Sequence, residues 1–340
     1  MSPRADAQKT FLANAGWAGA TVVPLAADAS FRSYHRVSKG DRAAVLMDAP
    51  PEHEDITPFV RVAKYLTQHG FSAPRIIFED EKRGFLLLED LGDQTYTREL
   101  AAGGDEAMLY ELAIDPLVQL HETAAPENLP ADIPPYDMDC LMAEVMLFID
   151  WYVPAVSKKD LGQVARGDYE AVWQETFAAL ASKRETLVLR DYHVDNLMWL
   201  QDRTGTAQCG LLDFQDALSG ARAYDLMSLL EDARRDVAPD LKEHLIQRYL
   251  AAMEDMDEAA LRHDMAILGA GRHAKVIGIF TRLSKRDGKS QYLKHIPHVW
   301  SLLENSLAHP ALSSVAKWFT RHVPSELRVT PSSKNSSANE

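Results

Sequence analysis

Three side chains in the middle of the chain have the types and the spacing that phosphoryl transfer needs. Asp191 and Asn196 lie five residues apart in a loop after a short apolar run, and Asp213 ends an apolar run that follows a glycine. A carboxylate can orient and deprotonate an attacking hydroxyl, whereas an amide oxygen and a second carboxylate can bind magnesium on a triphosphate. Residues of these types also end ordinary strands. Three at this spacing favour a catalytic site, with Asp191 as the base and Asn196 and Asp213 as metal ligands.

The order of these residues resembles a known catalytic segment. Asp-x-x-x-x-Asn, then a short hairpin and Asp-Phe, is the pattern of the protein-kinase-like fold. The form in this chain, Asp191-Tyr-His-x-x-Asn196 with Asp213-Phe-Gln-Asp216, is similar to the aminoglycoside phosphotransferase family. Within that family it most resembles the anomeric kinases of N-acetylmuramate and N-acetylglucosamine in cell-wall recycling. The resemblance extends from about residue 10 to residue 320.

The resemblance implies a sugar 1-kinase, an enzyme that uses ATP and magnesium to phosphorylate the anomeric (C1) hydroxyl of an amino sugar in peptidoglycan recycling. It also implies an α+β, two-lobed protein-kinase-like fold with a small antiparallel-sheet N-lobe and a larger, mainly helical C-lobe. Residues 1–92 would form the N-lobe with the nucleotide-covering loop and the hinge. Residues 93–324 would form the C-lobe with the catalytic loop and the substrate site. The polar residues 325–340 lack an apolar period and would form a disordered tail.

The elements that position these residues follow from apolar patterns and turn residues. Apolar runs predict a strand at 21–25 and a hairpin at 34–47 with a glycine in its turn. The loop between them would cover the nucleotide phosphates. Because this loop has no glycine, phosphate would be bound by backbone amides and polar side chains. The candidates for binding the nucleotide here are Ser30, Phe31 and Arg32.

A second hairpin is expected over 75–88, after an amphipathic helix at 55–69. Its last strand runs into an acidic segment that contains a glycine and resembles the hinge between kinase lobes. Backbone groups of such a hinge bind the edge of adenine. Glu89 and Leu91 are therefore candidates for binding the nucleotide.

Kinases carry a lysine in the third strand that binds the α- and β-phosphates, and this chain reads Leu46-Met-Asp48 there. Arg32 or Arg36 could point inward from the preceding strand, since neighbouring strand residues face opposite sides. The missing lysine and the missing glycine loop favour an alternative, a nucleotide-binding pseudokinase module. The complete set of a base and two metal ligands counts against that alternative.

Basic residues at two places are candidates for binding the substrate. Two flank the base, and three lie in the segment 275–292, which resembles a Phe-x-Arg-Leu-x-x-Arg-Asp-Gly-Lys-x-x-Tyr-Leu pattern of the same kinases. The second group could bind an anion, such as a lactyl carboxylate or a phosphate, or could stabilise a helix end. The five candidates are Arg190, His193, Arg282, Arg286 and Lys289. The resemblance also implies that Asp225 accepts hydrogen bonds from the catalytic loop.

Composition limits the function classes. The chain has 340 residues, long enough for two separate cores. Its formal net charge of -14 argues against nucleic acid or an anionic membrane as the main partner. Cys140 and Cys209 have no metal-binding spacing and are expected to be reduced thiols. The N-terminus lacks the apolar core of a signal peptide, and no run of 18 apolar residues occurs, so a cytoplasmic protein is expected. No motif indicates an oligomeric state.

A further alternative keeps the fold and changes the substrate. An enzyme of the same fold could phosphorylate another small alcohol, such as an aminoglycoside, choline or homoserine. An acidic surface would attract cationic substrates, whereas the basic segment at 282–289 favours anionic ones.

Overall fold

The computed structural model describes residues 3–25, 31–157 and 161–333. Contacts divide the chain into two compact units. Unit 1 comprises Met1–Gln119, Pro130–Asp132 and Val194–Ala217. Unit 2 comprises Leu120–Leu129, Ile133–His193 and Leu218–Glu340.

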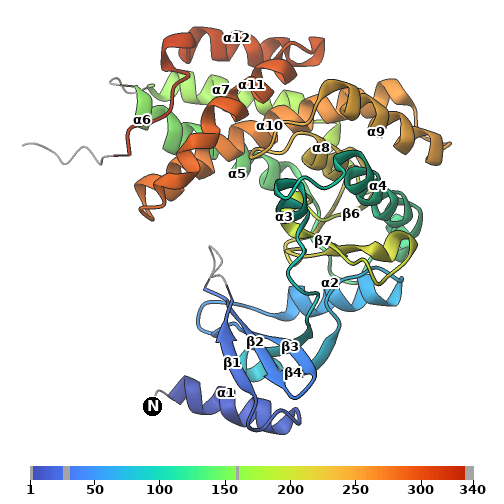
Figure 1. Cartoon of the computed structure of the whole chain (residues 1–340). Helices are drawn as coiled ribbons and strands as arrows, with labels where there is room; N and C mark the ends of the chain where they lie inside the picture. The colour runs from blue at the N-terminus through green and yellow to red at the C-terminus, as the bar shows by residue number, and fades with distance from the viewer. Residues whose placement is uncertain (1–2, 26–30, 158–160, 334–340) are drawn as a thin grey trace, which may run out of the picture. The chain divides into compact units, whose positions relative to one another are not determined.

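Unit 1 is built on a five-stranded antiparallel sheet, which helix α1 (Pro3–Asn14) covers on one side (Figure 1). In spatial order the strands are β1 (Thr21–Pro24), β2 (Ser33–Lys39), β3 (Arg42–Asp48), β5 (Phe85–Glu89) and β4 (Ile76–Asp80). Alternate apolar residues such as Leu46 and Leu87 point to one face, where they pack with Phe11 and Trp17. The predicted antiparallel N-terminal sheet is confirmed.

Helix α2 (Thr57–Gln68) has the amphipathic pattern that the sequence indicates. Pro58 lies in its first turn, and Gly70 follows it with a φ of 85° that favours glycine. The ring of Phe59, in α2, packs against the ring of Phe214, with ring centroids 5.1 Å apart. Because Phe214 directly follows Asp213, α2 supports the backbone that carries this candidate metal ligand.

The hairpin of β7 (Leu197–Trp199) and β8 (Cys209–Leu211) belongs to unit 1, as does most of α4 (Glu106–Thr123). The Leu211 N–H donates to the Ser72 carbonyl at 2.9 Å, and the Trp199 N–H donates to the Gln94 carbonyl at 2.8 Å. These bonds attach the hairpin to the N-terminal third of the chain. The bounds of the compact units therefore differ from the predicted division after residue 92.

Unit 2 is mainly helical, as predicted, and its helices pack around the 28-residue helix α10 (Glu258–Lys285) (Figure 1). α10 is buried over most of its length, from Leu261 to Ser284. Two short strands, β6 (Thr186–Val188) and β9 (Leu218–Gly220), pair antiparallel, and β6 ends three residues before Asp191. The other main helices are α5 (Met138–Leu147), α7 (Gln163–Phe177), α8 (Ala223–Leu230), α9 (Pro239–Ala252), α11 (Ile296–Leu307) and α12 (Ser313–His322).

The first residues of the expected disordered tail are ordered. Ser325–Leu327 form a 3-10 turn, and the Tyr152 hydroxyl accepts a hydrogen bond from the Val329 N–H at 2.9 Å. Arg328 forms an ion pair with Glu304 at 2.6 Å. A buried tyrosine far away in sequence thus holds this polar segment, and local composition cannot indicate such a contact. Residues 334–340 lie outside the described part of the chain.

Candidate active site

The two predicted metal ligands lie side by side in unit 1. Asn196 ends a 3-10 turn directly before β7, and Asp213 lies two residues after β8. Antiparallel pairing of the two strands brings their outer ends together, since the Leu212 N–H donates to the Asn196 carbonyl at 3.0 Å. The side-chain nitrogen Nδ2 of Asn196 lies 3.4 Å from Oδ2 of Asp213. Gln215 donates to the other carboxylate oxygen at 2.7 Å.

This pair suits magnesium. A hard cation prefers oxygen ligands, and magnesium is usually bound by one or two carboxylates together with substrate phosphates. Asp213 supplies a carboxylate, and an amide turned by half a rotation would present the Asn196 oxygen. Within residues 3–25, 31–157 and 161–333, no group of three or more His, Cys, Asp or Glu side chains could hold a metal by itself. The remaining ligands of a magnesium ion would come from nucleotide phosphates and water.

Two residues of the predicted site have left-handed backbone conformations. The φ angle is 71° at Arg190 and 60° at Asp213, and neither residue is glycine. Such conformations cost on the order of 1–3 kcal/mol and occur often at functional sites. The residue before the candidate base and one of the candidate metal ligands thus have backbone conformations that no pattern in the sequence predicts.

The base candidate Asp191 lies in unit 2, in a loop that Asp225 braces. One carboxylate oxygen of Asp225 accepts the Leu189 N–H at 2.6 Å, and the other accepts the Arg190 N–H at 2.9 Å. Asp225 itself is buried in the first turn of α8. The prediction that Asp225 accepts hydrogen bonds from the loop is confirmed.

Asp225→Ala is expected to destabilise the fold by about 2–6 kcal/mol, because two buried N–H groups would each lose their acceptor at roughly 1–3 kcal/mol. Urea unfolding, followed by circular dichroism, measures this change. Asp225→Asn, which keeps one acceptor oxygen, should lose about half as much. Equal stability of the Ala variant and the unsubstituted protein would contradict the bracing role.

A pH effect on stability should come from the same residue. Burial raises the pKa of Asp225 to about 7, although its two backbone hydrogen bonds oppose the shift. The folded protein therefore keeps this proton up to neutral pH, whereas the unfolded chain loses it near pH 4. Stability from this group is lost as pH rises from about 4 to 7. The difference in unfolding free energy between the unsubstituted protein and Asp225→Asn should shrink over this range, and a constant difference at pH 5 and pH 7.5 would contradict it.

Positive charges surround Asp191 and keep it ionised. Nη2 of Arg272 lies 4.0 Å from its Oδ1, and the Asp191 side chain is 43% exposed. Burial would raise the pKa of Asp191, but the charges of Lys275, Arg272 and Arg190 hold the pKa below its ordinary value. The carboxylate is therefore in the form that accepts a proton at neutral pH.

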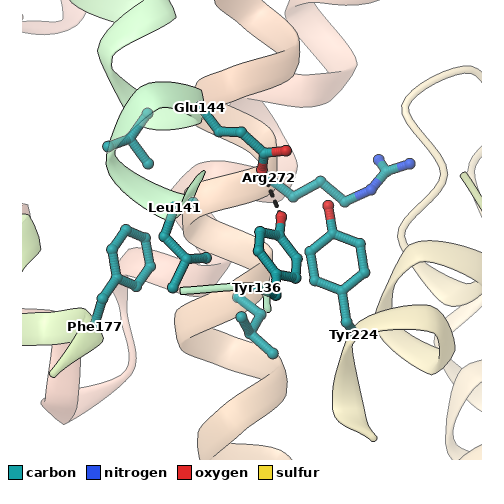
Figure 2. A pocket seen from close by; sticks show the side chains of 9 residues that line it. Tyr136, Leu141, Glu144, Phe177, Tyr224 and Arg272 are labelled. Carbon is teal, nitrogen blue, oxygen red and sulfur yellow. Dashed lines mark hydrogen bonds between the residues drawn. The ribbon is translucent and has the colours of Figure 1, made fainter. Parts of the chain in front are cut away.

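Two of these cations, Lys275 and Arg190, are held by one acid, Glu144 of α5, whose side chain is 13% exposed. Lys275 donates to Oε1 of Glu144 at 2.7 Å, and the Arg190 guanidinium forms an ion pair with the same oxygen. Burial would raise the pKa of Glu144, but these two cations hold the pKa low. The Tyr136 hydroxyl also donates to Glu144, in a narrow pocket between α5 and α10 (Figure 2). Arg190, predicted to bind substrate, is thus tied to α5.

His193, the other predicted substrate residue beside the base, is buried with 5% exposure. Burial lowers the pKa of its imidazole, so the neutral form prevails at pH 7. Its Nδ1 has no hydrogen-bond partner among the described residues.

The predicted basic residues after position 281 lie at the C-terminal end of α10 and in the turn that follows it. Arg282 and Arg286 are ten or more residues beyond Arg272, which corresponds to about 15 Å or more along a helix axis. Arg286 is exposed and forms an ion pair with Asp287 at 2.7 Å. The Lys289 N–H donates to the Leu283 carbonyl at 2.9 Å. The structure does not bring these three basic residues together with Asp191, and their contacts are those of a helix end.

The predicted phosphate-binding loop is described only in part. Ser30 lies outside the described residues. Phe31 is 68% exposed and stacks on His53, with ring centroids 4.6 Å apart. The Phe31 N–H donates to Glu54 at 3.1 Å, and Nε of Arg32 lies 3.8 Å from the same carboxylate. The Phe31 backbone and the Arg32 side chain thus both interact with the Glu54 carboxylate.

Glu89, at the start of the predicted hinge, binds two arginines from other segments of unit 1. The Glu89 carboxylate binds Arg75 at 3.0 Å and Arg203 at 2.9 Å. Its N–H donates to the Arg75 carbonyl at 2.8 Å, so the side chain and the amide of Glu89 are both used within unit 1. Leu91 is half-buried and lies against Gly210 of β8. Any nucleotide contact of Glu89 would therefore come from its carbonyl.

No lysine takes the place of the missing one within the described part of β3. Asp48, which ends this strand, binds Arg4 at 2.6 Å. Arg36 of β2 binds Asp90 at 2.6 Å and Asp93 at 2.8 Å, so its charge is neutralised at the hinge.

Three residues near Asp191 were not assigned from the sequence, namely Glu144, Arg272 and Lys275, although Lys275 begins the basic segment 275–292. One signal was available for two of them. Arg272 and Lys275 interrupt a long apolar stretch of a helix, and charged residues are almost never fully buried unless they are paired. Glu144 could not be assigned, because its partners lie 46 and 131 residues away.

Comparison with known proteins identifies the family of the chain. The family model described as the phosphotransferase enzyme family matches residues 21–261. The chain belongs to this family, and it is a phosphotransferase.

Two relatives are similar over nearly their whole length. An N-acetylmuramate/N-acetylglucosamine kinase of Caulobacter vibrioides is 36% identical, over 96% of this chain and 99% of that protein. A kinase of the same description from Pseudomonas aeruginosa is 37% identical, over 88% of this chain and 87% of that protein.

Solved structures share the fold. An aminoglycoside phosphotransferase with bound ADP has a TM-score of 0.59 at 15% identity, covering 89% of this chain and 98% of its own. A choline kinase from Streptococcus pneumoniae has a TM-score of 0.61 at 9% identity, covering 91% and 100%. The predicted protein-kinase-like fold is therefore confirmed. Across the described residues, no helix is both long and apolar enough to cross a membrane.

Proposed function

We propose that this protein is an ATP- and magnesium-dependent kinase that phosphorylates the anomeric hydroxyl of N-acetylglucosamine, N-acetylmuramate or both. The observation that carries the proposal is the ionised carboxylate of Asp191, held in a braced loop beside Arg272. The identity of the sugar is supported by the two relatives, whose names specify these amino sugars. A role in peptidoglycan recycling would follow from these substrates.

The chemistry assigns Asp191 to the attacking hydroxyl. The C1 hydroxyl of a reducing sugar is more acidic than an ordinary alcohol, because the ring oxygen withdraws electron density. A carboxylate with a lowered pKa can therefore orient this hydroxyl and accept its proton as the bond to phosphorus forms. Magnesium, when bound, would neutralise charge on the phosphates.

Residues of unit 1 would bind the nucleotide and the metal. Asn196 and Asp213 are proposed as magnesium ligands, since they pair two oxygen-bearing side chains at one end of a hairpin. Phe31, Arg32, the Glu89 carbonyl and Leu91 are proposed to contact ATP. Ser30 is proposed with them on sequence grounds alone.

Phosphorus NMR of the product tests the function. The protein is incubated with ATP, magnesium and separate sugars, and a sugar 1-phosphate is expected from N-acetylglucosamine or N-acetylmuramate. Methyl glycosides, in which C1 is blocked, serve as the control and should give no product. A 6-phosphate, or turnover of aminoglycosides or choline with none of these amino sugars, would overturn the proposal.

A further inference from the structure

Arg272 has an unusual environment for a buried cation. Its side chain is 4% exposed, yet its Nη1 donates no hydrogen bond to any of the described residues. The ion-pair partner that the described part of the chain offers is Asp191, at 4.0 Å, which is beyond hydrogen-bond distance. Buried donors are nearly always paired, because leaving one unpaired is costly. The guanidinium is thus placed to donate a hydrogen bond to a ligand from outside the chain.

The neighbouring acid does not fill this role. Glu144 binds Lys275 and Arg190, and Figure 2 shows the Arg272 guanidinium extending past the Tyr224 ring and away from Glu144. The charge of Arg272 is therefore left beside Asp191. Because the Asp191 side chain is 43% exposed and Arg272 is not, a ligand would approach the pair from the side of Asp191.

The chemistry of the sugar indicates which group would meet Arg272. If Asp191 accepts the proton of the C1 hydroxyl, a guanidinium about 4 Å from this carboxylate is within reach of a substituent on the neighbouring carbon, C2. N-acetylglucosamine and N-acetylmuramate both carry an acetamido group at C2. Its carbonyl oxygen is a good acceptor for a planar guanidinium.

We propose that Arg272 determines substrate specificity by donating a hydrogen bond to the 2-acetamido carbonyl oxygen of the sugar. This inference rests on the proposed function and names the residue that selects amino sugars over glucose. Asp232 supports it: the Asp232 carboxylate is buried, its Oδ2 has no partner among the described residues, and its charge acts on Arg272. It could accept the acetamido N–H.

The test compares unreactive substrate analogues. The 1,5-anhydro analogues of N-acetylglucosamine and of glucose lack the C1 hydroxyl, so calorimetric titration, or competition where binding is weak, gives their affinities without turnover. In Arg272→Met, the affinity for the acetamido analogue is expected to fall about 10- to 100-fold, the loss of a hydrogen bond to a charged group. The affinity for the glucose analogue should change less than about threefold, within the effect of a purely electrostatic neighbour at a solvated site.

Arg262→Met is the matched control, because it removes the same charge from the same helix at an exposed ion pair with Glu243. It should leave both affinities unchanged. Arg272→Lys keeps the charge but not the planar arrangement of donors. It should lower the affinity for the acetamido analogue by a smaller factor than Arg272→Met does, and it should leave the affinity for the glucose analogue unchanged. This variant carries the test if Arg272→Met fails to fold, as judged by thermal unfolding.

Four outcomes would overturn the inference. Equal losses for both analogues would make Arg272 a structural or purely electrostatic residue, and no loss for either would remove it from the site. An effect of Arg286→Met on the ratio, with none from Arg272→Met, would assign selection to the end of α10. If the unsubstituted protein forms no sugar 1-phosphate, the proposed function fails and the inference fails with it, whereas normal turnover with an unchanged ratio rejects the inference alone.

Discussion

Asp191→Asn is expected to lower kcat for N-acetylglucosamine by roughly 10² to 10⁴, the usual contribution of a positioned general base. Asparagine has nearly the same shape but cannot accept the proton of the attacking hydroxyl. Nucleotide affinity should stay nearly unchanged, because the residues proposed to bind ATP belong to other parts of the chain. Steady-state rates together with calorimetric titration of ATP would measure both quantities.

A matched control is Asp202→Asn, an exposed carboxylate in the turn between β7 and β8. It changes the net charge by the same amount and should leave kcat unaltered. If Asp191→Asn kept most of its turnover while Asp202→Asn behaved like the unsubstituted protein, Asp191 would have no part in proton transfer.

The second large effect is expected at the metal site. Asp213→Asn replaces a carboxylate by a neutral amide, which is a poorer ligand for a hard cation. ATP affinity in the presence of magnesium should fall by at least the roughly 10- to 100-fold typical for loss of an outer-shell partner of a metal. With EDTA in place of magnesium, the variant and the unsubstituted protein should bind ATP equally.

Asparagine is the right substitution because the backbone at this position has a φ of 60°. Asn and Asp both tolerate the left-handed region, so the change should remove the charge without new backbone strain. Alanine would confound the two effects. Unchanged metal dependence in Asp213→Asn would make this residue only a strand end, and the interpretation as a pseudokinase module would gain.

Local patterns were sufficient for much of the fold. The strands around residues 21–47, the helix at 57–68 and the segment from Asp191 to Asp213 each have a turn residue or an apolar period that identifies them. The brace from Asp225 could be predicted as well, because the resemblance fixes its place relative to the base. These features depend on neighbours that are close in sequence or on a pattern shared with a family.

Contacts between distant segments could not be predicted in this way. Glu144 joins Arg190 and Lys275 across 46 and 131 residues, and nothing in its local sequence distinguishes it from a solvated acid. Tyr152 holds the segment near Val329 through a contact across 177 residues. The backbone of Arg190 contacts Asp225, and its side chain contacts Glu144, which lie 35 and 46 residues away. Each case needs three-dimensional packing that composition does not encode.

The shared carboxylate of Glu144 also constrains how this chain can diverge. One acid forms ion pairs with two cations, so its loss would remove a partner from both, whereas loss of either cation would leave the acid still paired with the other. Substitution of Glu144 is therefore expected to be tolerated only after Lys275 and Arg190 have both changed. Among diverging descendants the order of substitution would be fixed, with the cations replaced first and the acid last.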